Sequence, residues 1–167
     1  VLFRSGHIIT ANSVTLDDNG NFEAVFNGDV KSSDVYLQVS DIAKNTRVVA
    51  DNDNNNVITT SEGNDIITVG NGNNVINAGR GENEIRTGNG NNVIITGDNN
   101  DVITTGSGND YIDAGRSGYT GMNKGDIVNA GAGDDKVVFT FDNPTAALSQ
   151  SLDGGTGTDT LIMRPVA

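Results

Sequence analysis

The stretch TGSGNDYID, residues 105–113, decides the fold, because its pattern of two glycines, an acid and an isoleucine returns every nine residues. The isoleucine of this unit recurs at a constant interval along the middle of the chain: Ile58, Ile67, Ile76, Ile85, Ile94, Ile103 and Ile112. A short, constant period is typical of a solenoid, in which each repeat stacks on its neighbours and buries a continuous core.

A second period of eighteen residues lies within the first. The heptapeptide GNGNNVI occurs at 70–76 and again at 88–94, whereas the unit between them reads GRGENEI at 79–85. Alternate units therefore belong to different environments, as in a flattened coil with two turns and two short strands per revolution. The predicted fold is all-β: a right-handed parallel β-roll, a β-solenoid of nine-residue half-turns and 18-residue coils. Odd-numbered turns then stack along one edge and even-numbered turns along the other.

The nonapeptides divide the chain into segments. The predicted roll covers 51–138, and its eighth unit contains a seven-residue insertion at 117–123. Residues 139–153 interrupt the pattern and are predicted to form a loop or a short helix that begins near Pro144. The final repeat lies in 154–167.

Residues 1–50 lack the nonapeptide and are predicted to form a small antiparallel unit, in which the DNGN turn at 18–21 joins two strands. The expected strands lie at 7–16, 22–26 and 35–39. The run DIAKNT at 41–46 resembles the D-x-A-G-N-T close of bacterial Ig-like domains, with Lys44 where that family has glycine. A β-cap that shields the first coil and a partial Ig-like domain both remain open for this segment.

The best-formed unit, GGTGTDTLI at 154–162, resembles the G-G-x-G-x-D-x-U-x nonapeptide of repeats-in-toxin (RTX) proteins. The resemblance implies Ca²⁺ as the cofactor. Calcium takes six to eight hard oxygen ligands, and tight glycine turns aim backbone carbonyls into the groove between stacked turns. The sixth position of each unit adds a carboxylate. We therefore expect each ion to lie between units that share an edge.

The predicted ligands follow from these positions. The expected carboxylates are Asp65, Asp101, Asp110, Asp126, Asp135 and Asp159. The expected backbone carbonyls lie near Gly97, Gly106, Gly108, Gly131, Gly133, Gly155 and Gly157.

Asparagine replaces aspartate at the sixth position of several units, and this divides the roll. The odd edge reads Asn56, Asn74, Asn92, Asp110 and Asp135, and the even edge is expected to read Asp65, Asn83, Asp101, Asp126 and Asp159. Neutral amides can bond to one another, whereas stacked carboxylates repel without a cation. We therefore expect calcium in the C-terminal half. The expected pairs of units are 105–113 with 130–138, 96–104 with 114–129, and 114–129 with 154–162.

Composition narrows the function. The net charge of −12 and a pI near 4.1 disfavour nucleic acid and anionic membranes as partners. Residues 51–113 hold ten acids and two bases, a net −8 of that total. The chain has no cysteine, which suits a bacterial secreted protein, and no 18-residue apolar run that predicts a membrane span. His7, the only histidine, has no metal partner in register, and the sequence offers no Ser/His/Asp set, cysteine nucleophile or phosphate loop, so no enzyme activity is predicted.

The expected function is a non-catalytic, calcium-binding structural module of a secreted bacterial surface protein. An RTX adhesin, a surface-layer protein or an extracellular filament are examples, and folding would be coupled to calcium met outside the cell. Two alternatives remain open: a glycan- or ice-binding module that uses the turn edge, and the repeat tail of a secreted enzyme. Outward-facing Val57, Val75 and Val93, together with exposed strand edges, further predict self-association or packing against neighbouring domains.

Overall fold

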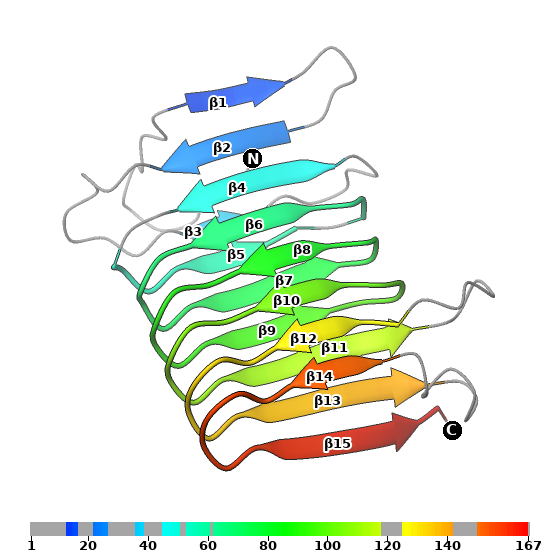
Figure 1. Ribbon diagram of the computed structural model, residues 1–167. Coiled ribbons are helices and arrows are strands. Elements are labelled where there is room, and N and C mark those ends of the chain that lie inside the picture. The colour runs from blue at the N-terminus through cyan, green and yellow to red at the C-terminus, as the bar shows by residue number, and fades with distance from the viewer. Residues whose placement is uncertain are drawn as a thin grey trace.

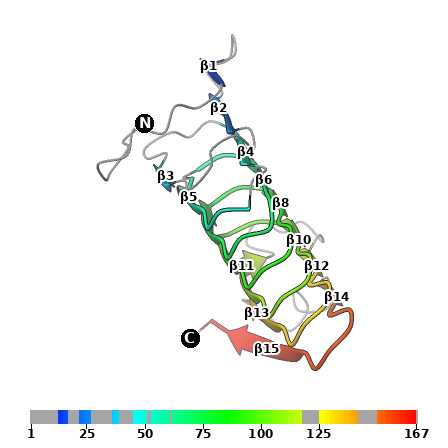
Figure 2. The same ribbon diagram turned by 90° about the vertical axis from the view of Figure 1, so that its left-hand side faces the viewer.

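The computed structural model confirms a parallel β-roll: two sheets lie face to face, and the chain passes from one to the other at each turn (Figures 1 and 2). The structure describes residues 13–16, 22–26, 36–38, 45–50, 53–60, 62–117, 125–141 and 150–166. Within these ranges every regular element is a strand, and no helix is long or apolar enough to span a bilayer.

Each sheet is formed by alternate half-turns of the chain. The even sheet contains, in spatial order, β1 (Ser13–Leu16), β2 (Phe22–Phe26), β4 (Thr46–Ala50), β6 (Ile66–Val69), β8 (Glu84–Arg86), β10 (Val102–Thr104), β12 (Ile127–Asn129) and β14 (Ser151–Asp153). The odd sheet contains β3 (Tyr36–Gln38), β5 (Val57–Thr59), β7 (Val75–Gly79), β9 (Val93–Thr96), β11 (Tyr111–Ser117), β13 (Lys136–Phe141) and β15 (Thr160–Pro165). The described pairings from β2 and β3 onward are parallel, as the roll requires.

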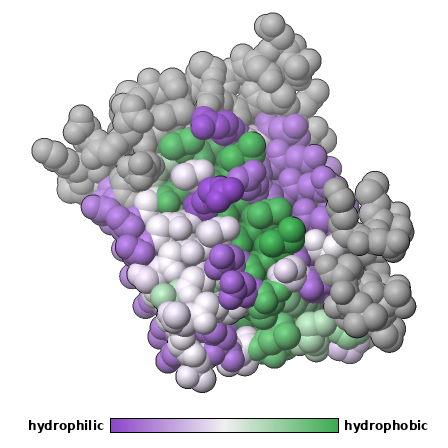
Figure 3. All heavy atoms as spheres, viewed as in Figure 1, coloured by the Kyte–Doolittle hydropathy of each residue, from purple (hydrophilic) through white to green (hydrophobic). Residues whose placement is uncertain are grey.

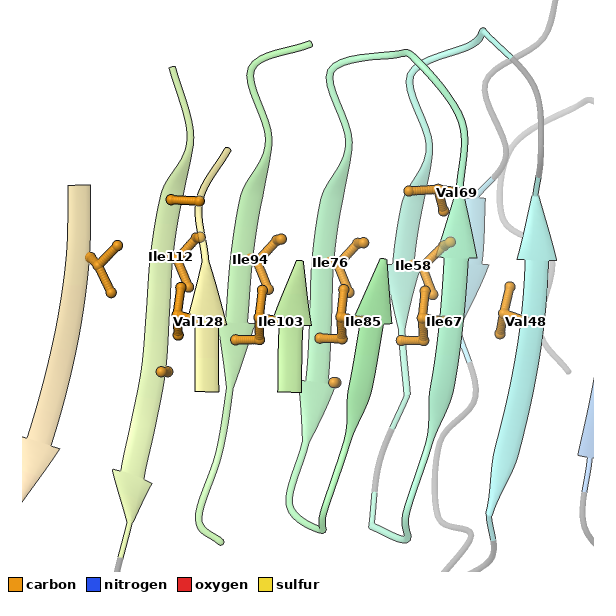
Figure 4. Close-up of a cluster of buried hydrophobic side chains, with 14 of the residues drawn as sticks. Val48, Ile58, Ile67, Val69, Ile76, Ile85, Ile94, Ile103, Ile112 and Val128 are labelled. Carbon is orange, nitrogen blue, oxygen red and sulfur yellow. The ribbon is translucent and has the colours of Figure 1, made fainter. Parts of the chain in front are cut away.

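The core is a double row of branched aliphatic side chains between the sheets (Figure 4). In the odd sheet the isoleucines pair in direct register, Ile58 with Ile76 and Ile94 with Ile112. All seven isoleucines of the series are fully buried. The flanking residues of each strand point outward because side chains alternate along a strand. The predicted core is confirmed.

The turns stack closely because glycine leaves no side chain between successive coils. Odd turns form the left edge in Figure 1 and even turns the right edge. Gly81 has a φ of 122°. A Cβ atom built on Gly81 would lie 1.8 Å from the carbonyl oxygen of Gly63 in the preceding coil. A methyl group there would force apart the backbone of the two coils.

The roll extends beyond the segments that the nonapeptide marks. Strand β4 pairs in parallel with β6, so a coil precedes Asp51. Strand β14 pairs with β12, with Leu152 opposite Val128, so an irregular unit lies within the predicted excursion at 139–153. Strand β13 also runs on to Phe141. Residues 142–149, where a helix was expected, lie outside the described part of the chain.

The N-terminal strands continue the sheets. Strands β1 and β2 pair in antiparallel fashion, with Ser13 opposite Val25, as the hairpin prediction requires. Strand β2 then pairs in parallel with β4, and β3 with β5. The expected turn at 18–21 and the Ig-like run at 41–44 lie outside the described residues.

An apolar row crosses the outer face of the even sheet. Val102 pairs directly with Ile127, and Glu84 separates Val102 from Ile66 along the same row. The exposed fractions of Ile66, Val102 and Ile127 are 43%, 38% and 51%. Hydrophobic side chains follow one another down this face in Figure 3. On the odd sheet the predicted outward orientation is confirmed for Val75, which is 43% exposed, whereas Val57 and Val93 are half-buried.

The close stacking of turns leads to a prediction for Gly81→Ala. The added methyl group meets the Gly63 carbonyl, and the φ of 122° disfavours any residue with a Cβ. The free energy of unfolding should fall by about 2 kcal/mol or more, measured by urea denaturation. The neighbouring exposed variant Glu82→Ala should change it by less than about 0.5 kcal/mol. Equal stability of the two variants would contradict the stacking argument.

Candidate metal centres

Both edges of the roll carry a buried ladder built on the sixth position of each unit. The side-chain oxygen of each residue accepts a hydrogen bond from the backbone N–H of the sixth-position residue one coil earlier. On the odd edge the N–H groups of Asn74, Asn92 and Asp110 donate to the side chains of Asn92, Asp110 and Asp135 over 3.1, 2.7 and 2.7 Å. The ladder continues to Asp159, which accepts from the Asp135 N–H over 3.1 Å.

The even edge repeats this arrangement. Asp65 accepts from the Thr46 N–H over 2.7 Å, and Asp101 accepts from the Asn83 N–H over 2.9 Å. Asp126 follows, accepting from the Asp101 N–H over 3.0 Å. The next ladder member is Gln150, whose Oε1 accepts from the Asp126 N–H over 2.7 Å.

The assignment of Asp159 to the even edge was therefore wrong. Strand β15 pairs with β13, so Asp159 stacks on Asp135 of the odd edge. Gln150 takes the even-edge place because residues 150–153 form a half-turn that lacks glycine and has glutamine where other units have aspartate or asparagine. The predicted metal site between 114–129 and 154–162 is withdrawn, and the neighbours on the odd edge are 130–138 and 154–162.

The side-chain nitrogen of asparagine at the sixth position is hydrogen-bonded on the odd edge, although Oδ1 of Asn56 has no partner among the described residues. The Asn74 side-chain amide donates to the carbonyl of Gly72 over 2.8 Å and to Oδ1 of Asn92 over 2.9 Å. Asn92 donates to the carbonyl of Gly90 over 2.8 Å and to Oδ1 of Asp110 over 2.9 Å. Each amide nitrogen thus lies among a carbonyl oxygen of its own turn and a side-chain oxygen of the next coil. The amide nitrogen therefore places its partially positive hydrogens between these oxygen atoms.

Aspartate at the same position has no such hydrogens, and its second oxygen, Oδ2, is left without a hydrogen-bond partner. The atoms Oδ2 of Asp65, Asp101, Asp110 and Asp135 are buried without a hydrogen-bond partner among the described residues. These four side chains are between 0% and 2% exposed. A buried carboxylate without a partner costs free energy, so these atoms call for a cation.

Two of the nearby threonine hydroxyls donate to backbone carbonyls. The Thr60 hydroxyl donates to the carbonyl of Ala78 over 2.9 Å, and the Thr105 hydroxyl donates to that of Ala130 over 2.7 Å. Each of these protons is thereby directed away from the neighbouring carboxylate. The Thr96 hydroxyl near Asp101 has no other partner among the described residues, and it lowers the pKa of Asp101 by less than burial raises it.

Burial shifts the titration of these acids. Desolvation raises the pKa of Asp65 to about 6 and that of Asp101 to about 7, with the Asp126 charge adding to the shift at Asp101. Desolvation also raises the pKa values of Asp110 and Asp135, and at Asp135 the charges of Asp110 and Asp159 act in the same direction. A cation would oppose both causes.

The predicted carbonyl ligands lie along the same edges. The carbonyls of Gly97, Gly106 and Gly131 each accept a backbone hydrogen bond from the following coil. Those of Gly108 and Gly133 lie against the next coil's glycine, because a Cβ on Gly133 would approach the Gly108 oxygen to 2.0 Å. Gly155 and Gly157 belong to the last described turn, and both have positive φ. A carbonyl oxygen has two lone pairs, so one hydrogen bond leaves capacity for a metal.

The donors fit calcium. The structure brings Asp110, Asp135 and Asp159 into one series and Asp101 and Asp126 into another, whereas Asp65 lies apart, between Thr46 and Asn83. The described residues contain no compact group of three or more His, Cys, Asp or Glu side chains. Ions would therefore draw most ligands from backbone carbonyls, with Asp65, Asp101, Asp110, Asp126, Asp135 and Asp159 as the carboxylates.

The two parallel sheets and the buried carboxylates of the turns together define a parallel β-roll with cation sites along its edges. The chain belongs to the family of RTX calcium-binding nonapeptide repeats, which it matches at residues 51–85, 86–117 and 120–145, more than half of its length. The repeats of this family bind Ca²⁺. No curated protein and no solved structure matches the chain.

Two further polar ladders support the odd edge on its solvent side. At the fifth position, the N–H groups of Asn91 and Asn109 donate to Oδ1 of Asn73 and Asn91, each over 2.8 Å. At the third position, the Asn89 N–H donates to Oδ1 of Asn71 over 3.0 Å. The side-chain oxygens of these asparagines thus hold successive coils together.

The unpartnered Oδ2 atom of Asp135 leads to a prediction for Asp135→Asn. Without calcium, the new amide can donate as Asn74 does, so the free energy of unfolding should rise by about 1–3 kcal/mol. With calcium, the loss of a shared carboxylate should raise the calcium midpoint at least tenfold, measured by circular dichroism.

The matched control is Asp134→Asn, which removes the same charge from the adjacent exposed position. Its Oδ1 accepts from the Thr158 N–H, and an amide oxygen can do the same. This variant should leave both quantities nearly unchanged. Identical behaviour of the two variants would show that the buried carboxylate has no special role.

The raised pKa values predict that the calcium-free chain loses stability as pH rises. An aspartate with a folded pKa of about 7 and an ordinary unfolded pKa near 3.9 must ionise in a buried site. The unfolded state therefore releases protons first, and the free energy of unfolding should fall between about pH 4 and pH 7. Urea denaturation in calcium-depleted buffer measures this. Asp101→Asn should flatten the slope, and a rise in stability across the range would contradict the prediction.

Proposed function

We propose that this chain is a non-catalytic, calcium-stiffened module of a secreted bacterial surface protein. The observation that carries the proposal is that the Oδ2 atoms of four aspartates are buried without a hydrogen-bond partner among the described residues: Asp65, Asp101, Asp110 and Asp135. Calcium binding by the repeats makes each of these oxygens a ligand, so the metal completes the fold. Membership of the RTX family, the net charge of −12 and the absence of cysteine support a calcium-rich extracellular setting.

The two halves of the roll differ in their need for calcium. On the odd edge, Asn56, Asn74 and Asn92 donate within the ladder and require no ion. From Asp110 onward the ladder consists of acids. The proposed module therefore has an N-terminal half in which only Asp65 calls for an ion, and a C-terminal half that becomes rigid when calcium binds. At the low calcium concentration of a cytoplasm, the C-terminal half would stay open for export.

The N-terminal strands fit the role of a cap. A solenoid needs a terminal unit that covers the exposed coil at each end. At the N-terminal end, β2 pairs in parallel with β4, and β3 with β5, so these strands cover the first coil of the nonapeptide region. An Ig-like sandwich is built from antiparallel sheets, so the parallel pairing favours the cap.

Self-association along a sheet face is the second part of the proposal. The apolar row of Ile66, Val102 and Ile127 offers a flat contact, and the Arg86–Glu84 ion pair of 2.9 Å divides it. A second copy could pack on this face in the extracellular assembly. The turn edges are less suited to ice, because the Asn71 and Asn73 oxygens are bound within the ladders.

Hydrogen exchange read by mass spectrometry tests the calcium-dependent half. With chelator, peptides from 126–141 should exchange at least about tenfold faster than with millimolar calcium, because the Asp135 ladder loses its cation. Peptides from 66–86 should keep most of their protection in both conditions. Asp135→Asn should reduce the difference for the first group. Equal loss of protection in both halves on chelation would overturn the division.

A further inference from the structure

The third position of the even-edge turns carries alternating charge. Going down this edge, the residues are Glu62, Arg80, Asp98 and Arg116. Parallel bridges connect the backbones of Glu62 with Arg80 and of Asp98 with Arg116. The Nε atom of Arg80 lies 3.4 Å from Oδ2 of Asp98. The same position on the odd edge holds Asp53 and then uncharged residues at 71, 89, 107, 132 and 156, so both arginines lie on the even edge.

A surface hollow of about 300 Å³ opens between these side chains. Its lining residues are Arg80, Asp98, Asn99 and Arg116. The Arg80 side chain is 68% exposed, so its guanidinium remains open to solvent beyond its contact with Asp98. The hollow is at the lower end of the volumes that bind small molecules. None of these four residues belongs to the sixth-position ladder.

Asn99 provides an independent sign of function. It has a φ of 97°, and it is the only residue other than glycine with positive φ in the described part of the chain. The equivalent fourth-position residues Gly81, Gly90 and Gly108 adopt similar values without a Cβ. Asparagine in this conformation is strained, and such strain gathers at binding sites. Asn99 is also one of the four residues that line the hollow.

The chemistry of the lining selects an anion that carries hydroxyl groups. Two guanidinium groups provide donors for a carboxylate, which arginine binds through paired hydrogen bonds. Asp98 accepts from hydroxyls, and the Asn99 amide both donates and accepts. The lining has a net charge of +1 on a chain of net −12, so a specific local contact is needed to hold an anion.

We propose that this hollow binds a carboxylated sugar, a uronic acid unit of an acidic polysaccharide. The sugar carboxylate lies between Arg80 and Arg116, and its ring hydroxyls contact Asp98 and Asn99. This site is separate from the calcium ladder and goes beyond the structural role. An exposed ion-pair ladder alone adds less than about 1 kcal/mol and gives no reason for a strained asparagine.

Nuclear magnetic resonance titration with methyl glucuronide tests the site, with methyl glucoside as the matched neutral sugar. The protein is kept in millimolar calcium. The glucuronide should shift the backbone amide signals of Arg80, Asn99 and Arg116, and the glucoside should not. Absence of shifts at tens of millimolar glucuronide would overturn the proposal. So would inorganic sulfate that binds as tightly as the glucuronide, because the site would then hold any small anion.

Variants separate binding from folding. Arg80→Gln and Arg116→Gln should each weaken glucuronide binding at least fivefold, and Asn99→Gly should weaken it while raising the melting temperature. The control Arg86→Gln changes an arginine that pairs with Glu84 on the outer sheet face and should bind normally. The calcium midpoint of each variant, read in the same samples, should stay unchanged. Binding that survives both arginine changes would contradict the assignment, and a shifted calcium midpoint would instead count against the separateness of the two sites.

Discussion

The structure depends on one repeated hydrogen bond, in which a sixth-position side-chain oxygen accepts the backbone N–H of the preceding coil. The bond recurs on both edges, from Thr46 to Gln150 on one and from Asn56 to Asp159 on the other. It is buried nearly throughout, and it holds each turn at the spacing that the isoleucine core requires. Both amide and carboxylate oxygens can make it, so the ladder tolerates either residue. The choice between asparagine and aspartate can therefore determine the charge at each turn without disturbing the ladder.

That choice sets the electrostatics of the roll. An asparagine adds an amide group that donates to the oxygens around it, as Asn74 does toward Gly72 and Asn92. An aspartate places a second oxygen in the same kind of environment, as Asp101 does, and the site then lacks positive charge. Calcium and the asparagine amide are thus alternative solutions to one problem of buried oxygens. On the odd edge the chain uses the amide toward its N-terminal end and acids toward its C-terminal end, whereas the even edge mixes the two.

Much of this architecture could be predicted from periodicity. The nine-residue spacing of isoleucine predicted the core, and the eighteen-residue repeat predicted two edges, because both depend only on how a regular chain stacks. The half-turn at Gln150 and Leu152 was missed because it lacks the glycines and the acid that mark a unit. That omission misplaced Asp159 by one edge. The stranded Oδ2 atoms and the strain at Asn99 could not be read from sequence, since both depend on how one coil sits on the next.

The central claim is that aspartate turns hold calcium and asparagine turns replace it. A crystal structure in millimolar calcium, with the ions located by anomalous scattering, tests this most directly. The account predicts ions beside Asp101, Asp110 and Asp135, and an amide nitrogen without an ion at Asn56, Asn74 and Asn92. Ions of equal occupancy at the asparagine turns would contradict it.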